Sequence, residues 1–211
     1  EDLWQLTLVA YDYLGELSLI CGLLFVNGLS IIDGHVFTYE PSSHGSESRR
    51  KIVDVFTVRA VQPPLDESVW VRYREELAGL LHLLHAGDYA AAQGALVKRV
   101  AMTMTGLTAR NVTLYPVDIE IDNDSSPDYT VMEIDSLDTP GFLYEFANAL
   151  ALQRVHIGRV TVATVAERVH DTVYVTDTKG RKITQPQQER ELRAATVLVK
   201  YFTHLLPSSP N

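Results

Sequence analysis

Cysteine is nearly absent from this chain: Cys21 stands alone among 211 residues. An internal disulfide is therefore impossible, and this low cysteine content is typical of proteins from reducing compartments. No apolar run approaches the roughly 18 residues that a membrane-spanning helix needs. We therefore expect a cytoplasmic protein with no membrane partner.

Positive charge is also scarce, since 18 Lys and Arg residues stand against 27 Asp and Glu, for a net charge of −9. An acidic surface repels nucleic-acid phosphates and anionic lipids, so we expect no nucleic-acid partner. Hydrophobic residues make up 46% of the chain and charged residues 21%. That balance excludes global disorder and predicts a packed core.

Motifs for catalysis and for cofactors are missing too. Gly22, Gly28 and Gly34 form no phosphate-binding loop, because neither Gly-Lys-Ser/Thr nor Gly-x-Gly-x-x-Gly follows a strand. There is no Gly-x-Ser-x-Gly, no His-Glu-x-x-His and no kinase set. His82 and His85 share a helix face without a completing ligand. We expect no catalytic residues, no metal and no cofactor, so the chain is not predicted to be an enzyme by itself.

The acidic run from Asp122 to Asp128 resembles the spacing of a calcium loop. However, Pro127 stands where that loop requires glycine, and the flanks have the pattern of strands instead of helices. We interpret this run as a hairpin turn.

The stretch Asp138–Leu143 lies between a strand pattern and a helix pattern, with Pro140 and Gly141 at the turn. A strand, a tight turn and a helix start in succession direct backbone N–H groups toward one point. Such a point can hold a small anion, for example an amino-acid carboxylate. The turn can equally be structural, with Asp138 as a helix cap.

A second copy of this stretch occurs at Asp12–Leu17. Asp12 and Asp138 differ by 138 − 12 = 126 positions, and Gly15 and Gly141 keep the same offset. Further along, Asp54 aligns with Asp171 at an offset of 171 − 54 = 117, because the first copy has a longer loop. The sequence therefore predicts two copies of one structural unit.

Each copy has the pattern strand, helix, strand, strand, helix. The expected strands are 3–11, 30–39, 51–60, 112–122, 129–135, 156–166 and 168–176, and the expected helices are 15–27, 66–84, 89–104, 142–152 and 187–206. A closing strand is expected near 112–122 for the first copy and at 181–184 for the second. Two such small units gain stability by pairing edge to edge.

The fold class predicted is α+β: two ferredoxin-like βαββαβ units with antiparallel sheets, joined by a helical segment. The first unit spans 1–106, with its helical linker from about 66, and the second spans 107–211, with a C-terminal helix. The chain begins at Glu1 and ends in a linker-like run, so we expect a fragment of a longer polypeptide.

The Asp-x-Pro-Gly-x-Leu turn, its helix and the strand pair at 158–164 and 171–177 resemble an ACT domain. The tandem arrangement is similar to the paired ACT domains of nitrogen-signalling nucleotidyltransferases. Those include the uridylyltransferase of the PII signal protein, and the glutamate–ammonia-ligase adenylyltransferases are a second candidate parent. The resemblance covers nearly the whole chain except the helices at 69–105.

This resemblance implies a regulatory module that binds a small amino acid, with glutamine as one candidate, and signals to an attached nucleotidyltransferase domain. It implies ligand contacts from the turn before each helix and from the start of the following strand. The residues concerned are, for the first copy, Asp12, Leu14, Gly15 and Ser30, and for the second, Asp138, Pro140, Gly141 and His156. The first copy departs from the family pattern because Leu14 replaces the proline.

Two other classes of function stay open. A protein-interaction or dimerisation module without a ligand would dock a partner, or a second copy of the chain, through the helix that carries Trp70, Tyr73 and Leu77. An enzyme would need a catalytic cluster, and the sequence shows none.

Overall fold

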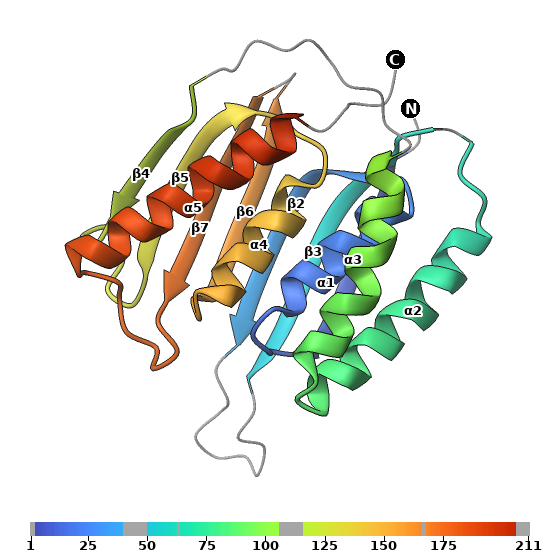
Figure 1. Ribbon diagram of the computed structural model, residues 1–211, viewed down its shortest axis with the longest axis horizontal. Coiled ribbons are helices and arrows are strands. Elements are labelled where there is room, and N and C mark those ends of the chain that lie inside the picture. The colour runs from blue at the N-terminus through green and yellow to red at the C-terminus, as the bar shows by residue number, and fades with distance from the viewer. Residues whose placement is uncertain (1–2, 40–49, 63, 106–115, 166–167, 206–211) are drawn as a thin grey trace.

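The structure is a computed structural model that describes residues 3–39, 50–62, 64–105, 116–165 and 168–205. The strands are β1 (Leu3–Tyr11), β2 (Leu29–Tyr39), β3 (Lys51–Ala60), β4 (Asp118–Asp122), β5 (Thr130–Leu137), β6 (His156–Val165) and β7 (Arg168–Thr176). The helices are α1 (Glu16–Val26), α2 (Ser68–His85), α3 (Tyr89–Thr105), α4 (Phe142–Leu152) and α5 (Pro186–Leu205). The strands form one antiparallel sheet in the order β1-β3-β2-β6-β7-β5-β4, and the helices cover one of its faces (Figure 1). The α+β class is confirmed.

The two glycine turns have the same backbone conformation. Gly15 caps α1 with φ 89° and ψ −1°, and Gly141 caps α4 with φ 72° and ψ 8°. Both values are left-handed, a conformation that glycine adopts without the clash that a Cβ would cause. Each helix that follows has 11 residues. The two strand–turn–helix copies are therefore equivalent in structure as well as in sequence.

Strand pairing repeats in the same register. Leu8 of β1 faces Asp54 of β3, and the equivalent Ile134 of β5 faces Asp171 of β7. An irregularity in register also recurs at equivalent positions, after Ile31 in β2 and after Ile157 in β6. Bulges bend a strand locally and change its twist, so a repeated bulge gives both copies the same curvature.

The copies meet edge to edge through β2 and β6, as expected. The facing pairs are Asp33 with Ala163, Gly34 with Val162, His35 with Thr161, Val36 with Val160, and Phe37 with Arg159. His35 and Thr161 are equivalent at the 126 offset, and their neighbours exchange places on either side of them. The junction is therefore a pseudo-two-fold one, in which each copy presents the same strand to the other.

The expected βαββαβ order is wrong in its last strand. β4 pairs with β5 by a short hairpin and does not close the first copy. The segment 181–184 is not a strand, and the backbone N–H of Ile183 instead donates to the Thr130 hydroxyl at 2.8 Å. Because only a short turn separates β4 from β5, the hairpin forms locally, whereas β1 lies at the opposite edge of the sheet. The acidic run at 122–128 is that hairpin turn, as predicted.

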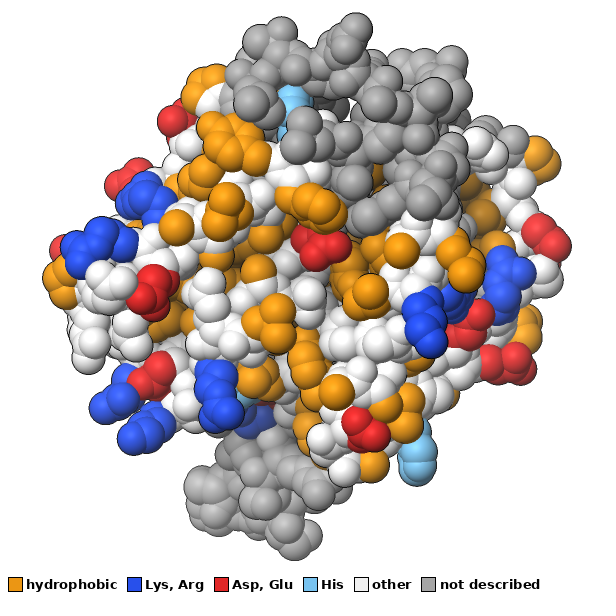
Figure 2. Space-filling model, viewed as in Figure 1, with side chains coloured by type: hydrophobic (Ala, Val, Ile, Leu, Met, Phe, Trp, Pro, Cys, Tyr) orange, Lys and Arg blue, Asp and Glu red, His pale blue; other side chains and the backbone are white. Residues whose placement is uncertain are grey.

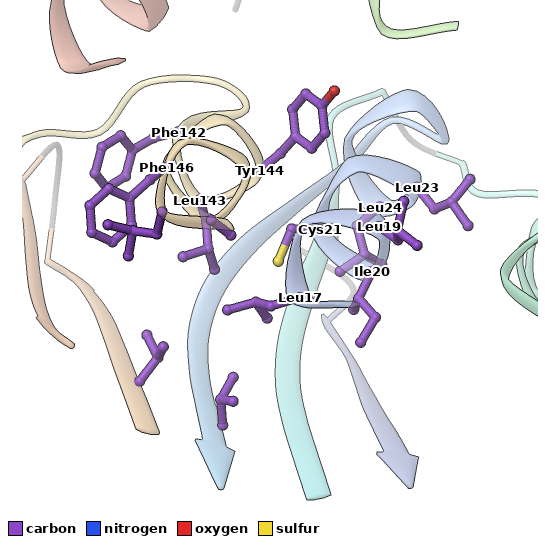
Figure 3. Packing of buried hydrophobic residues seen from close by; sticks show 14 of the residues in the cluster. Leu17, Leu19, Ile20, Cys21, Leu23, Leu24, Phe142, Leu143, Tyr144 and Phe146 are labelled. Atoms are coloured by element: carbon purple, nitrogen blue, oxygen red, sulfur yellow. The ribbon is translucent and has the colours of Figure 1, made fainter. Parts of the chain in front are cut away.

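The core lies between the sheet and the paired helices α1 and α4. All α1 residues from Glu16 to Leu24 are buried, because the sheet, α4, α2 and α3 surround this helix. Figure 3 shows Leu17, Cys21 and Leu143 pointing into the space between α1, α4 and the sheet. Cys21 is a buried free thiol whose pKa is raised by burial, and it packs as a small core hydrophobe.

The two middle helices, α2 and α3, make different contacts. Trp70 of α2 packs near Trp4 of β1, with ring centroids 6.4 Å apart. Tyr89 of α3 reaches the second copy, where its hydroxyl donates to Asn148 Oδ1 at 3.0 Å. Among the described residues, no helix combines the length and apolar character needed to cross a bilayer.

The two turns should respond differently to alanine. In Gly141→Ala the new Cβ meets only the Phe25 ring at ordinary contact distance, 3.6 Å, so the cost is that of left-handed backbone alone, about 1–2 kcal/mol. In Gly15→Ala the Cβ lies only 2.3 Å from the Tyr89 ring, so Tyr89 must also move. We expect Gly15→Ala to lower the free energy of unfolding more than Gly141→Ala, as measured by urea denaturation. Equal losses would contradict this packing.

Candidate functional site

A pocket opens where the first glycine turn meets the second copy. The first turn contributes Asp12 through Ser18, and β6 and the residue before it contribute Val155, His156 and Ile157. Ala147 and Ala151 of α4 and three inward residues of β2 and β3 complete its lining: Val36, Ile52 and Asp54. Its cavity volume is about 30 Å³, enough for about two water molecules. A larger ligand would fit only if it extended outward or if the lining moved.

The structure groups the predicted site residues across the two copies instead of within each. Asp12, Leu14 and Gly15 share the pocket with His156, and Ser30 lies outside it. Ser30 therefore does not line this pocket with the first turn. The cause is the two-fold junction, which brings the start of β6 beside the first turn. Whether these residues bind a ligand stays a prediction.

Glu16 closes the first turn by a reciprocal pair of hydrogen bonds. The backbone N–H of Tyr13 donates to Glu16 Oε2 at 3.2 Å, and the backbone N–H of Glu16 donates to the Tyr13 carbonyl at 3.0 Å. Oε1 of Glu16 is buried and has no hydrogen-bond partner among the described residues. Burial is the main reason that the pKa of Glu16 rises to about 8, although its bond to Tyr13 opposes the rise.

Asp12 is the charged link between the two copies. Its Oδ2 lies 3.2 Å from Nε of Arg50, just before β3, and 3.9 Å from Nδ1 of His156 in β6. The side chain of Asp12 is only 7% exposed. Burial lowers the pKa of His156 in spite of the attraction of Asp12, so the imidazole is mainly neutral at pH 7.

Asp54 is a fully buried carboxyl group in the pocket wall. Asp54 is 0% exposed, and neither of its side-chain oxygens has a hydrogen-bond partner among the described residues. Burial, with repulsion from Asp12, raises the pKa of Asp54 to about 8. A buried carboxyl group without a partner is costly, so a native structure that keeps one invites a functional explanation.

The equivalent place beside the second turn is filled by side chains of the chain itself. Phe25 of α1 takes the position of Ala151, and its ring lies 3.6 Å from where a Cβ of Gly141 would stand. Phe142 takes the position of Glu16 and stacks on Phe146, with ring centroids 5.4 Å apart. The first turn therefore keeps a pocket, whereas the second is packed with aromatic rings.

The remaining predicted residues lie outside the pocket at the first turn. Thr139 and Lys200 line a separate pocket of about 10 Å³, and Asp138, Pro140 and Gly141 lie outside it. Ser30 lies at the start of β2, opposite Arg59 of β3. The described ranges contain no set of three His, Cys, Asp or Glu side chains placed to hold a metal ion.

Sequence reasoning missed Glu16, Arg50 and Asp54. A signal for Asp54 was present: a carboxylate stands at an inward position of an alternating strand, between Ile52 and Phe56, and the second copy repeats it as Asp171. Arg50 carried no such signal, because its approach to Asp12 depends on the pairing of β1 with β3.

Comparison with known proteins places the chain beside one group of enzymes. It is 29% identical over 198 residues to the bifunctional uridylyltransferase/uridylyl-removing enzyme of Rhodopseudomonas palustris, with 92% of this chain covered. The enzyme of the same name from Rhodospirillum rubrum is 31% identical over 185 residues, 87% of the chain. That from Ruegeria pomeroyi is 42% identical over 77 residues, 36% of the chain.

The chain spans only a small share of these relatives. It covers 19% of the Rhodopseudomonas protein, 18% of the Rhodospirillum protein and 8% of the Ruegeria protein. No family model matches the chain. The similarity to uridylyltransferase/uridylyl-removing enzymes therefore concerns one part of a much longer protein.

The buried carboxyl groups predict an unusual dependence of stability on pH. Asp54 has a pKa near 3.8 when unfolded and about 8 when folded, so its contribution to stability is full below pH 4 and is lost as pH rises toward 8. Asp54→Asn removes this ionisable group. We expect the variant to be more stable than the wild type at pH 7.5, on the order of 2 kcal/mol, and to lose this advantage at pH 4. Thermal unfolding at both pH values checks this, and a variant less stable at pH 7.5 would contradict it.

Proposed function

We propose that this chain is the amino-acid-sensing regulatory part of a uridylyltransferase/uridylyl-removing enzyme, built as two ACT units of residues 1–106 and 107–211. The observation that carries the proposal is the pocket at the first turn, which both copies line. The covered relatives are enzymes of that name, and the resemblance to tandem ACT domains accounts for the repeated strand–turn–helix. The attached nucleotidyltransferase domain, nitrogen signalling and a cytoplasmic location belong to the same proposal.

The ligand that suits this pocket is zwitterionic. Deep in the pocket, Glu16 and Asp54 present carboxyl oxygens without hydrogen-bond partners among the described residues. At the turn, Arg50 pairs with Asp12 just beyond the pocket lining, the neutral imidazole of His156 offers hydrogen-bonding nitrogens, and the N-terminus of α1 adds a partial positive charge. An amino acid offers an ammonium group to the first region and a carboxylate to the second.

Ligand binding here would act on the arrangement of the copies. The pocket joins the first turn to β6 and α4, so an occupied pocket adds contacts between the copies that the empty one lacks. A ligand that favours one arrangement shifts the population toward it, and an attached domain that contacts both copies would respond. The small cavity agrees with a ligand that enters as the lining adjusts.

A second candidate function is an interaction or dimerisation module that needs no ligand. Tyr73 and Leu77 of α2, which were expected to dock a partner, are buried at 2% and 5% exposed, so this helix face is not free for docking. Within the described ranges, the helices cover one face of the sheet and leave the other open (Figure 1). Exposed apolar side chains lie along the strands, among them Leu3 at 57% exposed, Val9 at 70% and Val165 at 66%. This face suits an attached domain or a second copy of the chain.

Calorimetric titration of the chain with the twenty L-amino acids tests the first proposal. We expect at least one, with glutamine as the first candidate, to bind, and His156→Ala to weaken it about tenfold, because a pocket wall and its hydrogen-bonding groups are lost. His170→Ala is the matched control. His170 of β7 is half-exposed, lies beside Asp135 of β5 and is away from the pocket. If no amino acid binds, the sensing function is refuted and the interaction module is favoured.

A further inference from the structure

Asp54 and Asp171 are the same residue in the two copies, and they differ in what surrounds them. Both point inward from equivalent strands, β3 and β7, at equivalent register positions, and both are nearly fully buried, at 0% and 3% exposed. A carboxylate buried in this way is stable only near a compensating positive charge or as a neutral acid. The groups that surround the buried carboxyl group differ between the two copies.

In the second copy the compensating charge belongs to the chain. Lys200 of α5 is 2% exposed, its ammonium group donates to the Leu137 carbonyl at 3.2 Å, and it lies 3.5 Å above the centre of the Phe142 ring. Burial lowers its pKa to about 8 against the opposing attraction of Asp171 and Asp138. That attraction also limits the rise in the pKa of Asp171. Oδ1 of Asp171 lacks a hydrogen bond, but the carboxyl group accepts one from the backbone N–H of Ala163. The compensation by Lys200 is electrostatic.

In the first copy no buried lysine takes this place among the described residues. The groups that face Asp54 are Asp12 of the turn, Glu16 and Cys21 of α1, and Tyr73 of α2, with Arg50 and His156 drawn toward Asp12. The carboxyl groups outnumber the nearby cations. Phe25 and Phe142 fill the place beside the second turn, whereas Ala151 and Glu16 leave a pocket at the first turn.

We propose that the chain has a single amino-acid site, at the first turn, in which the ammonium group of the ligand pairs with Asp54 as Lys200 compensates Asp171 in the second copy. The inference rests on the proposed sensing function and deepens it. The second turn, which has the family's proline and glycine, is a structural copy that Lys200 and two phenylalanine rings already occupy. Only the turn with Leu14 binds a ligand.

The ligand class follows from this geometry. A primary ammonium group is compact and has three donors, which match the unpartnered oxygens of Asp54 and Glu16. An analogue whose amine is acylated has neither the charge nor the donors. Because Asp54 must ionise to pair with an ammonium group, binding near neutral pH also releases protons.

The test is titration calorimetry on the 211-residue chain and two matched variants, Asp54→Asn and Asp171→Asn. The titrants are the twenty L-amino acids, and the N-acetyl form of each one that binds. We expect one site per chain, affinity lower by roughly thirtyfold or more in Asp54→Asn, and less than about twofold change in Asp171→Asn. The N-acetyl form should not bind. Affinity should rise between pH 6 and 8 in the wild type and rise less in Asp54→Asn.

The outcomes separate the two proposals. If an amino acid binds with two sites per chain, equally well to Asp54→Asn, or equally well after N-acetylation, this inference is overturned and the sensing function stands. If no amino acid binds the wild type, both are overturned. Thermal unfolding of each variant without ligand shows that a loss of binding does not come from a loss of fold.

Discussion

The pairing of β2 with β6 is the contact on which the rest of the structure depends. Each copy alone would be a small sheet with an open edge, and the junction turns two such edges into backbone hydrogen bonds inside one sheet. The same contact sets α1 against α4 and makes α1 a helix buried on all sides. Without it there would be neither a common core nor a pocket between the copies.

The two-fold character of this junction also explains why the site is shared. Antiparallel pairing at His35 and Thr161 reverses one copy with respect to the other, so the turn of one copy lies beside the start of β6 in the other. A duplicated unit joined in this way has two equivalent places. Small differences in side chains, Ala151 against Phe25 and Glu16 against Phe142, leave one place open and fill the other.

The helix-covered face is chemically uneven. In Figure 2 the charged side chains gather mainly toward the two sides of this face, and the middle is mostly hydrophobic and uncharged. Against that background, buried ionisable groups such as Asp54, Asp171 and Lys200 stand out because each costs free energy where it lies. Asp54 and Asp171 occupy equivalent positions of the repeat, and the side chains around them differ.

Local chemistry was sufficient to predict the elements. The turns at Gly15 and Gly141 predict the starts of α1 and α4, the alternation of Ile52, Asp54 and Phe56 predicts β3, and the constant offset predicts two copies of one unit. The sequence did not determine whether β4 or the segment at 181–184 forms the last strand of the second copy, because both are short. Pairing at the edge of β5 decides between them. Nor could it bring His156 or Arg50 to Asp12, since those contacts join residues far apart along the chain. Sequence alone thus determined the repeating unit, through backbone preferences and periodicity that act over a few residues. Tertiary structure alone decided which turn has a pocket, because that depends on the volumes and charges that the other copy brings across the junction.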